Sequence, residues 1–137
     1  MIGQLYINDK DAFASWGSFL EEGSENALLL PAPNKEYTSN KARSQHGKQV
    51  SRRLPRKDER DIILYFCLSA SNRDEYIQKY EAFVDELDSG IVTMKVPSLK
   101  KVYKLDAISY QELSFYDHIG KIAVKFNEPN PKNRIQL

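Results

Sequence analysis

The sequence predicts a mainly β fold of the α+β class, a β-sandwich flanked by one α-helix at about residues 72–89. Three observations support this prediction. Only one stretch, Ser69–Val96, shows helical periodicity together with clear start and stop signals. Short apolar or alternating runs, which are typical of strands, recur through most of the remaining chain. A long polar segment at about residues 34–57 is expected to project from the sandwich as a hairpin or loop.

The predicted helix has a continuous apolar face. That face is formed by Tyr76, Ile77, Tyr80, Phe83, Val84 and Leu87. Ser71 is expected to cap the first turn, with Asp74 three residues later completing a capping box. Gly90 is expected to end the helix in a left-handed conformation. Because no other stretch has comparable helical signals, one helix is expected to cover the sheet.

Strands are predicted on either side of this helix. The expected strands are Gln4–Ile7, Ala27–Leu30, Ile62–Leu68, Ile91–Val96, Val102–Tyr116 and Lys121–Asn127. Residues 13–20 have mixed spacing, which leaves a distorted strand and a single helical turn as alternatives. Ile62–Leu68 is apolar throughout, which predicts a central strand covered on both faces. Val102–Tyr116 alternates with one expected bulge and forms a hairpin with the strand that follows.

Length and composition indicate one domain over residues 1–137, made of the core, a basic arm at 34–57 and a tail at 128–137 without a core signal. The net charge of +1 provides no overall attraction to nucleic acid or membrane. Cys67 is the single cysteine and is expected to be a small buried hydrophobe. With no signal peptide and no apolar run of about 20 residues, the chain is expected to be soluble and made in a reducing cytoplasm.

The near-neutral total conceals a separation of charge. Residues 35–60 contain nine basic and three acidic residues, whereas residues 72–88 contain six acidic and two basic ones. The basic arm has too few large apolar side chains to offset its own ordering entropy. We therefore expect contact with another molecule to order it.

No motif for catalysis, cofactor binding or metal binding is present in the sequence. His46 and His118 fall in separate polar turns, without metal-ligand spacing to each other or to Cys67. The acidic pairs lie on expected turns or solvated helix faces, where nothing raises a carboxyl pKa for acid–base work. The chain is therefore expected to be no enzyme, to need no cofactor or metal, and to have no membrane partner.

Basic residues of the arm allow three interpretations. The residues concerned are Lys41, Arg43, Lys48, Arg52, Arg53, Arg56 and Lys57. They could neutralise phosphates of a nucleic acid, but Tyr37 is the only aromatic residue among them for stacking on bases. A solvated loop is the second interpretation. A contact between subunits is the third, and it is the one we favour.

Several segments together resemble a known family. These are the opening INDKDAFASWGSFL, LLLPAPNKEY, the region around HGK, DERDIILYF and the helix NRDEYIQKYEAF. They resemble the N-terminal, ring-forming region of phage distal tail proteins. The ending KFNEPNPKNR is similar to prophage tail proteins of gut Bacteroidetes.

The resemblance implies a sandwich with one helix and a long hairpin or loop that reaches a neighbour. Members of that family form hexameric rings between the tail tube and the tip or baseplate, with a lumen through which DNA passes. The implied partners are copies of the chain and other tail proteins (tube, tip or hub), and DNA only in transit. The implied location is the virion tail, after assembly in the bacterial cytoplasm. Because tail tube subunits share this unit, a tail tube or tail-completion subunit is the first alternative, and a small nucleic-acid-binding module is the second.

A ring requires unlike surfaces to meet between neighbours. Our hypothesis is that basic residues of the arm approach acidic residues on the helix of the adjacent subunit. The proposed contacts are Arg43, Lys48, Arg52, Arg53, Arg56 and Lys57 on the arm, with Asp85 and Glu86 on the helix.

Overall fold

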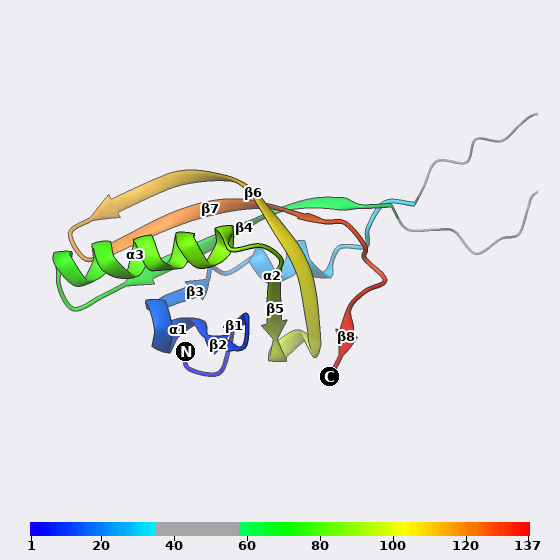
Figure 1. The fold of residues 1–137 in the computed structure, drawn as a ribbon, viewed down its shortest axis with the longest axis horizontal. Helices are drawn as coiled ribbons and strands as arrows, with labels where there is room; N and C mark the ends of the chain where they lie inside the picture. The colour runs from blue at the N-terminus through cyan, green and yellow to red at the C-terminus, as the bar shows by residue number, and fades with distance from the viewer. Residues whose placement is uncertain (35–57) are drawn as a thin grey trace, which may run out of the picture.

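The computed structural model describes residues 1–34 and 58–137, so the basic arm, apart from Asn34, lies outside the described residues. The predicted mainly β fold with one long helix is confirmed (Figure 1). The strands are β1 Tyr6–Ile7, β2 Lys10–Asp11, β3 Ser18–Leu20, β4 Arg60–Ser69, β5 Val92–Val96, β6 Lys101–Tyr116, β7 Ile119–Glu128 and β8 Ile135–Gln136. The α-helices are α1 Ala12–Trp16, α2 Ser24–Leu29 and α3 Arg73–Asp88, and Pro97–Leu99 forms a 3-10 turn.

All the described strands belong to one antiparallel sheet with the order β2-β1-β5-β6-β7-β4-β3, and β8 is added beside β6. β6 joins the two halves, because Lys101–Leu105 pairs with β5 whereas Asp106–Tyr116 pairs with β7. Figure 1 shows β6 arching from one half to the other. The two layers expected of a sandwich are therefore the halves of a single curled sheet.

The main core lies inside this curl, under α3. Phe66 on β4 packs edge-on against Phe83 of α3 and Phe126 of β7, with ring centroids 5.2 and 6.2 Å apart. Trp16 of α1 reaches the same Phe83 ring at 5.8 Å. Offset and edge-to-face aromatic pairs of this kind contribute about 0.5–1.5 kcal/mol each beyond burial. The aromatic residues thus connect the helix to both halves of the chain.

The apolar face predicted for α3 is confirmed in its main members. Tyr76, Phe83 and Leu87 are buried, whereas Ile77 at the margin of the face is 38% exposed. The cap prediction was one residue early, because Asn72 rather than Ser71 is the N-cap and accepts a hydrogen bond from the Glu75 amide at 2.8 Å. An Asn side chain makes this bond as well as Ser does. Gly90 follows the C-cap Ser89 and has a positive φ of +133°, which favours glycine but lies beyond the left-handed helical value that was predicted.

β4 lies next to the edge strand β3 rather than at the centre of the sheet, and it is covered on one face only, so the prediction of a central, doubly covered strand at Ile62–Leu68 is wrong. Its residues alternate, so that Ile62, Leu64 and Phe66 are buried while Ile63 and Tyr65 are 46% and 40% exposed. The reason is that β7 and β3 pair with the edges of β4, and α3 covers only the inner face. The apolar run therefore leaves an apolar outer face on the sheet.

Two N-terminal expectations are settled by contacts with β4. Residues 13–20 contain both alternatives, since the helical turn α1 is followed by the short strand β3. The predicted strand Ala27–Leu30 is wrong, because α2 occupies Ser24–Leu29. The Ser24 hydroxyl accepts a hydrogen bond from the Tyr65 amide at 2.9 Å, which places this helix beside β4. Of the three consecutive leucines at positions 28–30, only Leu28 is buried.

The C-terminal region is more ordered than its sequence indicates. β6 and β7 form the predicted hairpin, but with register shifts at two places rather than one. The tail predicted to lack a core signal begins with the fully buried Glu128 and ends with β8 paired to β6. Charged contacts, which hydrophobic patterning does not detect, hold this segment.

Gly17 provides a test of how α1 joins the sheet. Its φ is +63°, and a Cβ there would collide with the Ser69 carbonyl oxygen. We expect Gly17→Ala to lower the free energy of unfolding by about 2–4 kcal/mol in urea denaturation, from left-handed strain plus overpacking. Gly23→Ala is the matched control, because Gly23 also has a positive φ but open space around it. Equal losses in the two variants would contradict the proposed collision.

Candidate functional site

The structure describes only two of the predicted interface residues. Those of the arm lie outside the described residues, so only Asp85 and Glu86 can be located. Asp85 is exposed on α3. Glu86 lies toward the N-terminal strands, where its carboxylate accepts a hydrogen bond from Lys10 Nζ at 2.7 Å and is 15% exposed. Asp85 is therefore open to a neighbour, whereas Glu86 already has a partner within its own chain.

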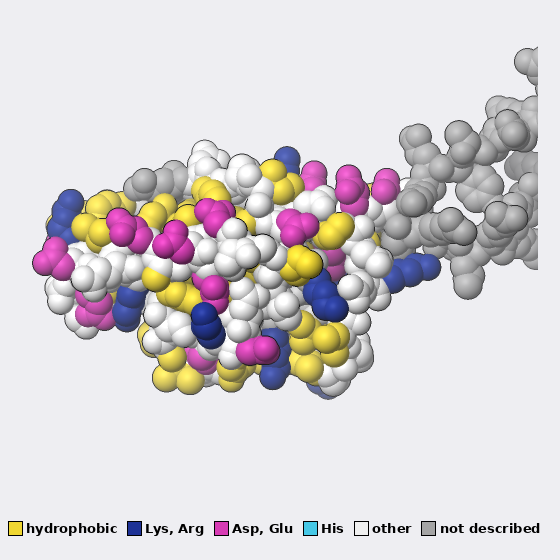
Figure 2. Space-filling model, viewed as in Figure 1, with side chains coloured by type: hydrophobic (Ala, Val, Ile, Leu, Met, Phe, Trp, Pro, Cys, Tyr) yellow, Lys and Arg dark blue, Asp and Glu magenta, His cyan; other side chains and the backbone are white. Residues whose placement is uncertain are grey.

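Asp85 belongs to a larger acidic stripe on α3. The stripe consists of four exposed carboxylates, Asp74, Glu81, Asp85 and Asp88. Spacings of seven, four and three residues place them on one side of an α-helix. Figure 2 shows acidic side chains gathered over α3. The spacing of these acidic residues is visible in the sequence, although Asp85 is the only one of them that was predicted as a site residue.

The two ends of the stripe meet the sheet differently. Asp88 accepts a short hydrogen bond from the Tyr110 hydroxyl of β6. Burial first, and then this hydrogen bond, raise the pKa of the Tyr110 phenol. At the other end, Phe115 of β6 stacks on Tyr76 of α3 with a centroid distance of 4.9 Å, and the Arg73 guanidinium lies 5.3 Å from the Phe115 ring. These contacts fix the stripe relative to β6.

A buried charge cluster lies where the described chain resumes after the arm. Arg60 opens β4, and its Nε donates to Glu128 at 2.5 Å. Arg134 donates to both oxygens of the same carboxylate at 2.8 and 2.7 Å. Arg60 is 4% exposed and Glu128 is fully buried. Both guanidinium groups also lie over the Tyr103 ring, with Cζ of Arg60 and of Arg134 at 5.7 and 5.1 Å from the ring centroid.

The cluster has more donors than acceptors. Arg60 also donates to the Ala27 and Leu30 carbonyls, at 3.2 and 2.6 Å. Arg60 Nη2 and Tyr103 Oη nevertheless have no hydrogen-bond partner in the part of the chain that the structure describes. Burial raises the pKa of Glu128, but the hydrogen bonds from Arg134 and the charge of Arg60 outweigh it and leave that pKa lowered. The carboxylate is thus held ionised between two cations.

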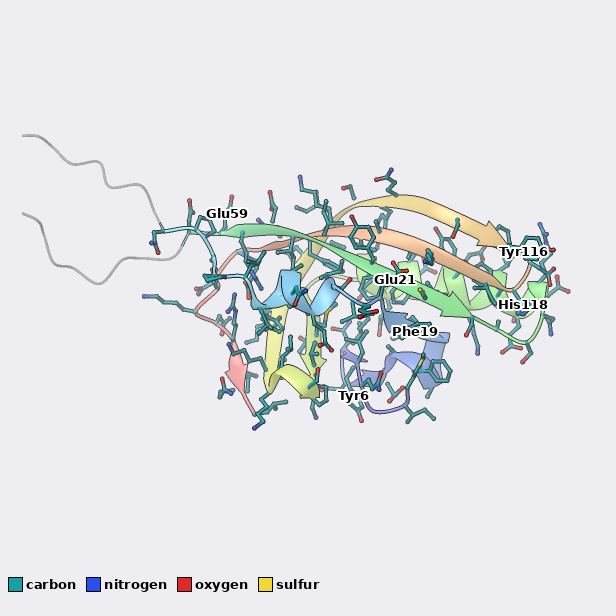
Figure 3. The ribbon with its side chains drawn as sticks, turned by 180° about the vertical axis from the view of Figure 1, so that it is seen from behind. Tyr6, Phe19, Glu21, Glu59, Tyr116 and His118 are labelled. Carbon is teal, nitrogen blue, oxygen red and sulfur yellow. The ribbon has the colours of Figure 1, made fainter. Side chains whose placement is uncertain are left out.

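The remaining candidate groups for chemistry are scattered. His118 Nδ1 lies 3.0 Å from its neighbour Asp117 in the turn between β6 and β7, with Tyr116 close by (Figure 3). Cys67 is half-buried, and burial raises the pKa of its thiol. Within residues 1–34 and 58–137, no cluster of His, Cys, Asp or Glu could hold a metal ion. None of the helices described there has the length and hydrophobicity required to cross a membrane.

Comparisons with protein-family models, curated proteins and solved structures found no match to this chain.

The charge cluster gives a prediction for stability. Glu128→Gln leaves the buried Arg60 and the partly buried Arg134 without their carboxylate, which should lower the free energy of unfolding by about 3–5 kcal/mol. Glu75→Gln is the control, because Glu75 makes a partly exposed pair with Lys79 within α3, and such pairs contribute only about 0.3–0.5 kcal/mol. If Glu128→Gln and Glu75→Gln lowered the free energy of unfolding by similar amounts, the stabilising role of the cluster would be contradicted.

The same variant isolates a pH dependence. A carboxyl whose folded pKa is lowered stabilises the fold above its unfolded pKa, and this contribution is lost as the pH falls through the folded pKa. The difference in unfolding free energy between wild type and Glu128→Gln should therefore be constant near neutrality and shrink below about pH 4.5, the ordinary Glu value. A difference that grew on acidification would contradict this assignment.

Proposed function

We propose that this protein is a structural subunit of a phage or prophage tail, of the distal tail type, which forms a ring between the tail tube and the tip or baseplate. The observation that carries the proposal is the separation of opposite charges within one chain. The acidic stripe is exposed on α3, and the sequence places eight basic residues and one acidic residue between positions 35 and 57. Complementary charges on different surfaces favour association between copies.

The geometry of the fold supports a head-to-tail contact. In Figure 1 the described chain breaks off at one end of the long axis, whereas α3 extends toward the other end, where β6 turns into β7. A basic arm that starts at the first end and reaches α3 of the next copy uses two different surfaces. Such heterologous contacts close into rings when the rotation between neighbours permits it.

Individual exposed ion pairs are weak, contributing about 0–1 kcal/mol each. Several pairs must therefore act together, and apolar contacts must supply much of the affinity. Ile77, which lies between Asp74 and Glu81 on α3, is 38% exposed and offers one such contact. The other tail partners in this proposal are tube and tip or hub proteins, with DNA only passing through the lumen of the ring.

Charge reversal tests the proposal directly. Glu81→Lys with Asp85→Lys should abolish ring formation at low salt, because the arm of the neighbour then meets like charge. The measurement is light scattering coupled to size exclusion, followed by electron microscopy of the particles. Glu22→Lys with Glu59→Lys is the matched control, since both residues are exposed outside the stripe and the charge change is identical.

Two further outcomes make the result specific. Adding Arg52→Glu and Arg53→Glu to the α3 reversal should restore assembly, because the charges are then exchanged rather than lost. A wild-type chain that remains monomeric at every concentration would overturn the ring proposal. Salt-dependent binding of DNA by that monomer would favour the nucleic-acid-binding alternative.

A further inference from the structure

β6 has a long edge that no other strand covers. From Asp106 to Tyr116 it pairs with β7 on one side. On the other side β5 ends opposite Leu105, and no strand in the described part of the chain continues the pairing. Figure 1 shows this part of β6 as the outer boundary of the sheet. Backbone amides and carbonyls along such an edge are available for pairing with another chain.

The edge carries few of the side chains that usually prevent such pairing, since Asp106 and Glu112 are the only charged residues along it. Between Asp106 and Tyr116 the sequence contains no Lys, Arg or Pro, the residues that commonly protect exposed edges. Apolar side chains are exposed there instead, with Ile108 at 52%, Phe115 at 39% and Tyr116 at 84%. Tyr116 lies at the end of β6 (Figure 3). The combination of an open edge and exposed apolar side chains is typical of an interaction surface.

Two register shifts limit how far a regular partner strand can extend. They lie between Ala107 and Ser109 and between Glu112 and Ser114. Such bulges bend an edge and weaken its pairing. Ser109–Glu112 keeps a regular register with β7 between them. Any strand added here is therefore anchored on this short stretch, and the contact is weak rather than permanent.

The other strands of the described chain cannot serve as the partner. β2, β3 and β8 contain only two or three residues each. The first half of β4 is flanked by α2, where Tyr65 N donates to Ser24 Oγ at 2.9 Å, and by residues 30–33, where Asp58 N donates to Pro33 O at 2.7 Å. Among the described strands, only β6 is both long enough and open enough along one edge to pair with the open β6 edge of another copy.

We propose that the β6 edge pairs antiparallel with β6 of a second copy, forming a two-fold dimer with one sheet continuous across both chains. Antiparallel pairing places the Asp106 end of one β6 beside the Tyr116 end of the other. The Asp106 carboxylate can then accept a hydrogen bond from the Tyr116 hydroxyl, twice in the dimer. An isologous contact of this kind uses the same surface on both copies.

This dimer does not rest on the ring proposal, because it uses β6 instead of the acidic stripe and the arm. The two contacts also differ in their response to salt. In about 1 M salt the Debye length is about 3 Å, so pairing between exposed charges is screened. Backbone pairing and apolar contact persist under these conditions.

Sedimentation velocity in high salt tests the dimer. The wild type should show a reversible monomer–dimer equilibrium. Ser109→Lys with Gln111→Lys should weaken dimerisation at least tenfold, because four like charges then gather near the two-fold axis. Both residues are exposed, so the monomer should keep its circular dichroism spectrum and thermal midpoint. Gln4→Lys with Gln78→Lys is the matched control and should dimerise like wild type.

Cross-linking identifies the contact independently. In a Cys67→Ser background, Gln111→Cys should give cross-linked dimers with a short bismaleimide, whereas Gln4→Cys should not. A wild type that is monomeric in high salt at all concentrations would overturn the inference, as would a dimer unaffected by the lysine pair. A wild type that dimerises in high salt but forms no rings at low salt would refute the ring proposal alone.

Discussion

The architecture depends on one strand serving two halves of a sheet. β6 is 16 residues long, pairs first with β5 and then with β7, and changes partner at Leu105 and Asp106. Because strands twist as they extend, a strand of this length cannot keep both halves in one plane. The sheet curls, and the concave side receives Phe66, Phe83 and Phe126. α3 connects β4 to β5 across this space. Its apolar face therefore covers the core on the concave side of the sheet.

A buried charge cluster complements the aromatic core at the opposite end of the sheet. Glu128 fixes Arg60 at the start of β4 and Arg134 in the tail, which are distant in sequence. A buried ion pair adds little over well-packed apolar residues, but removing one member leaves an uncompensated charge. The cluster therefore defines a single arrangement of these segments. Arg60 is the third residue after the arm, so the cluster fixes the start of β4 close to the point where the described chain resumes.

The surface is divided into regions of different character. α3 exposes carboxylates, the outer face of β4 exposes Ile63 and Tyr65, and β6 leaves its edge open. These exposed groups differ in kind, being carboxylates on α3, apolar side chains on β4 and backbone amides and carbonyls on β6. In our proposals the charged surface is used for head-to-tail association, which salt should weaken, and the β6 edge for two-fold pairing, which salt should leave intact. The two proposed contacts therefore differ in physical origin and can be tested separately.

The sequence by itself determined the elements whose signals are local. The apolar face of α3, its end shortly before Gly90 and the alternation of β7 follow from residues a few positions apart, as does the spacing that places Asp85 in an acidic stripe. Only the tertiary structure decided the helical state of α2, the exposure of Ile63 and Tyr65, and the contacts of Glu86 and Glu128. Ser24 meets Tyr65, Lys10 meets Glu86 and Arg60 meets Glu128 across 41, 76 and 68 residues. Periodicity carries no information on such pairs, because their energies depend on which elements the fold brings together.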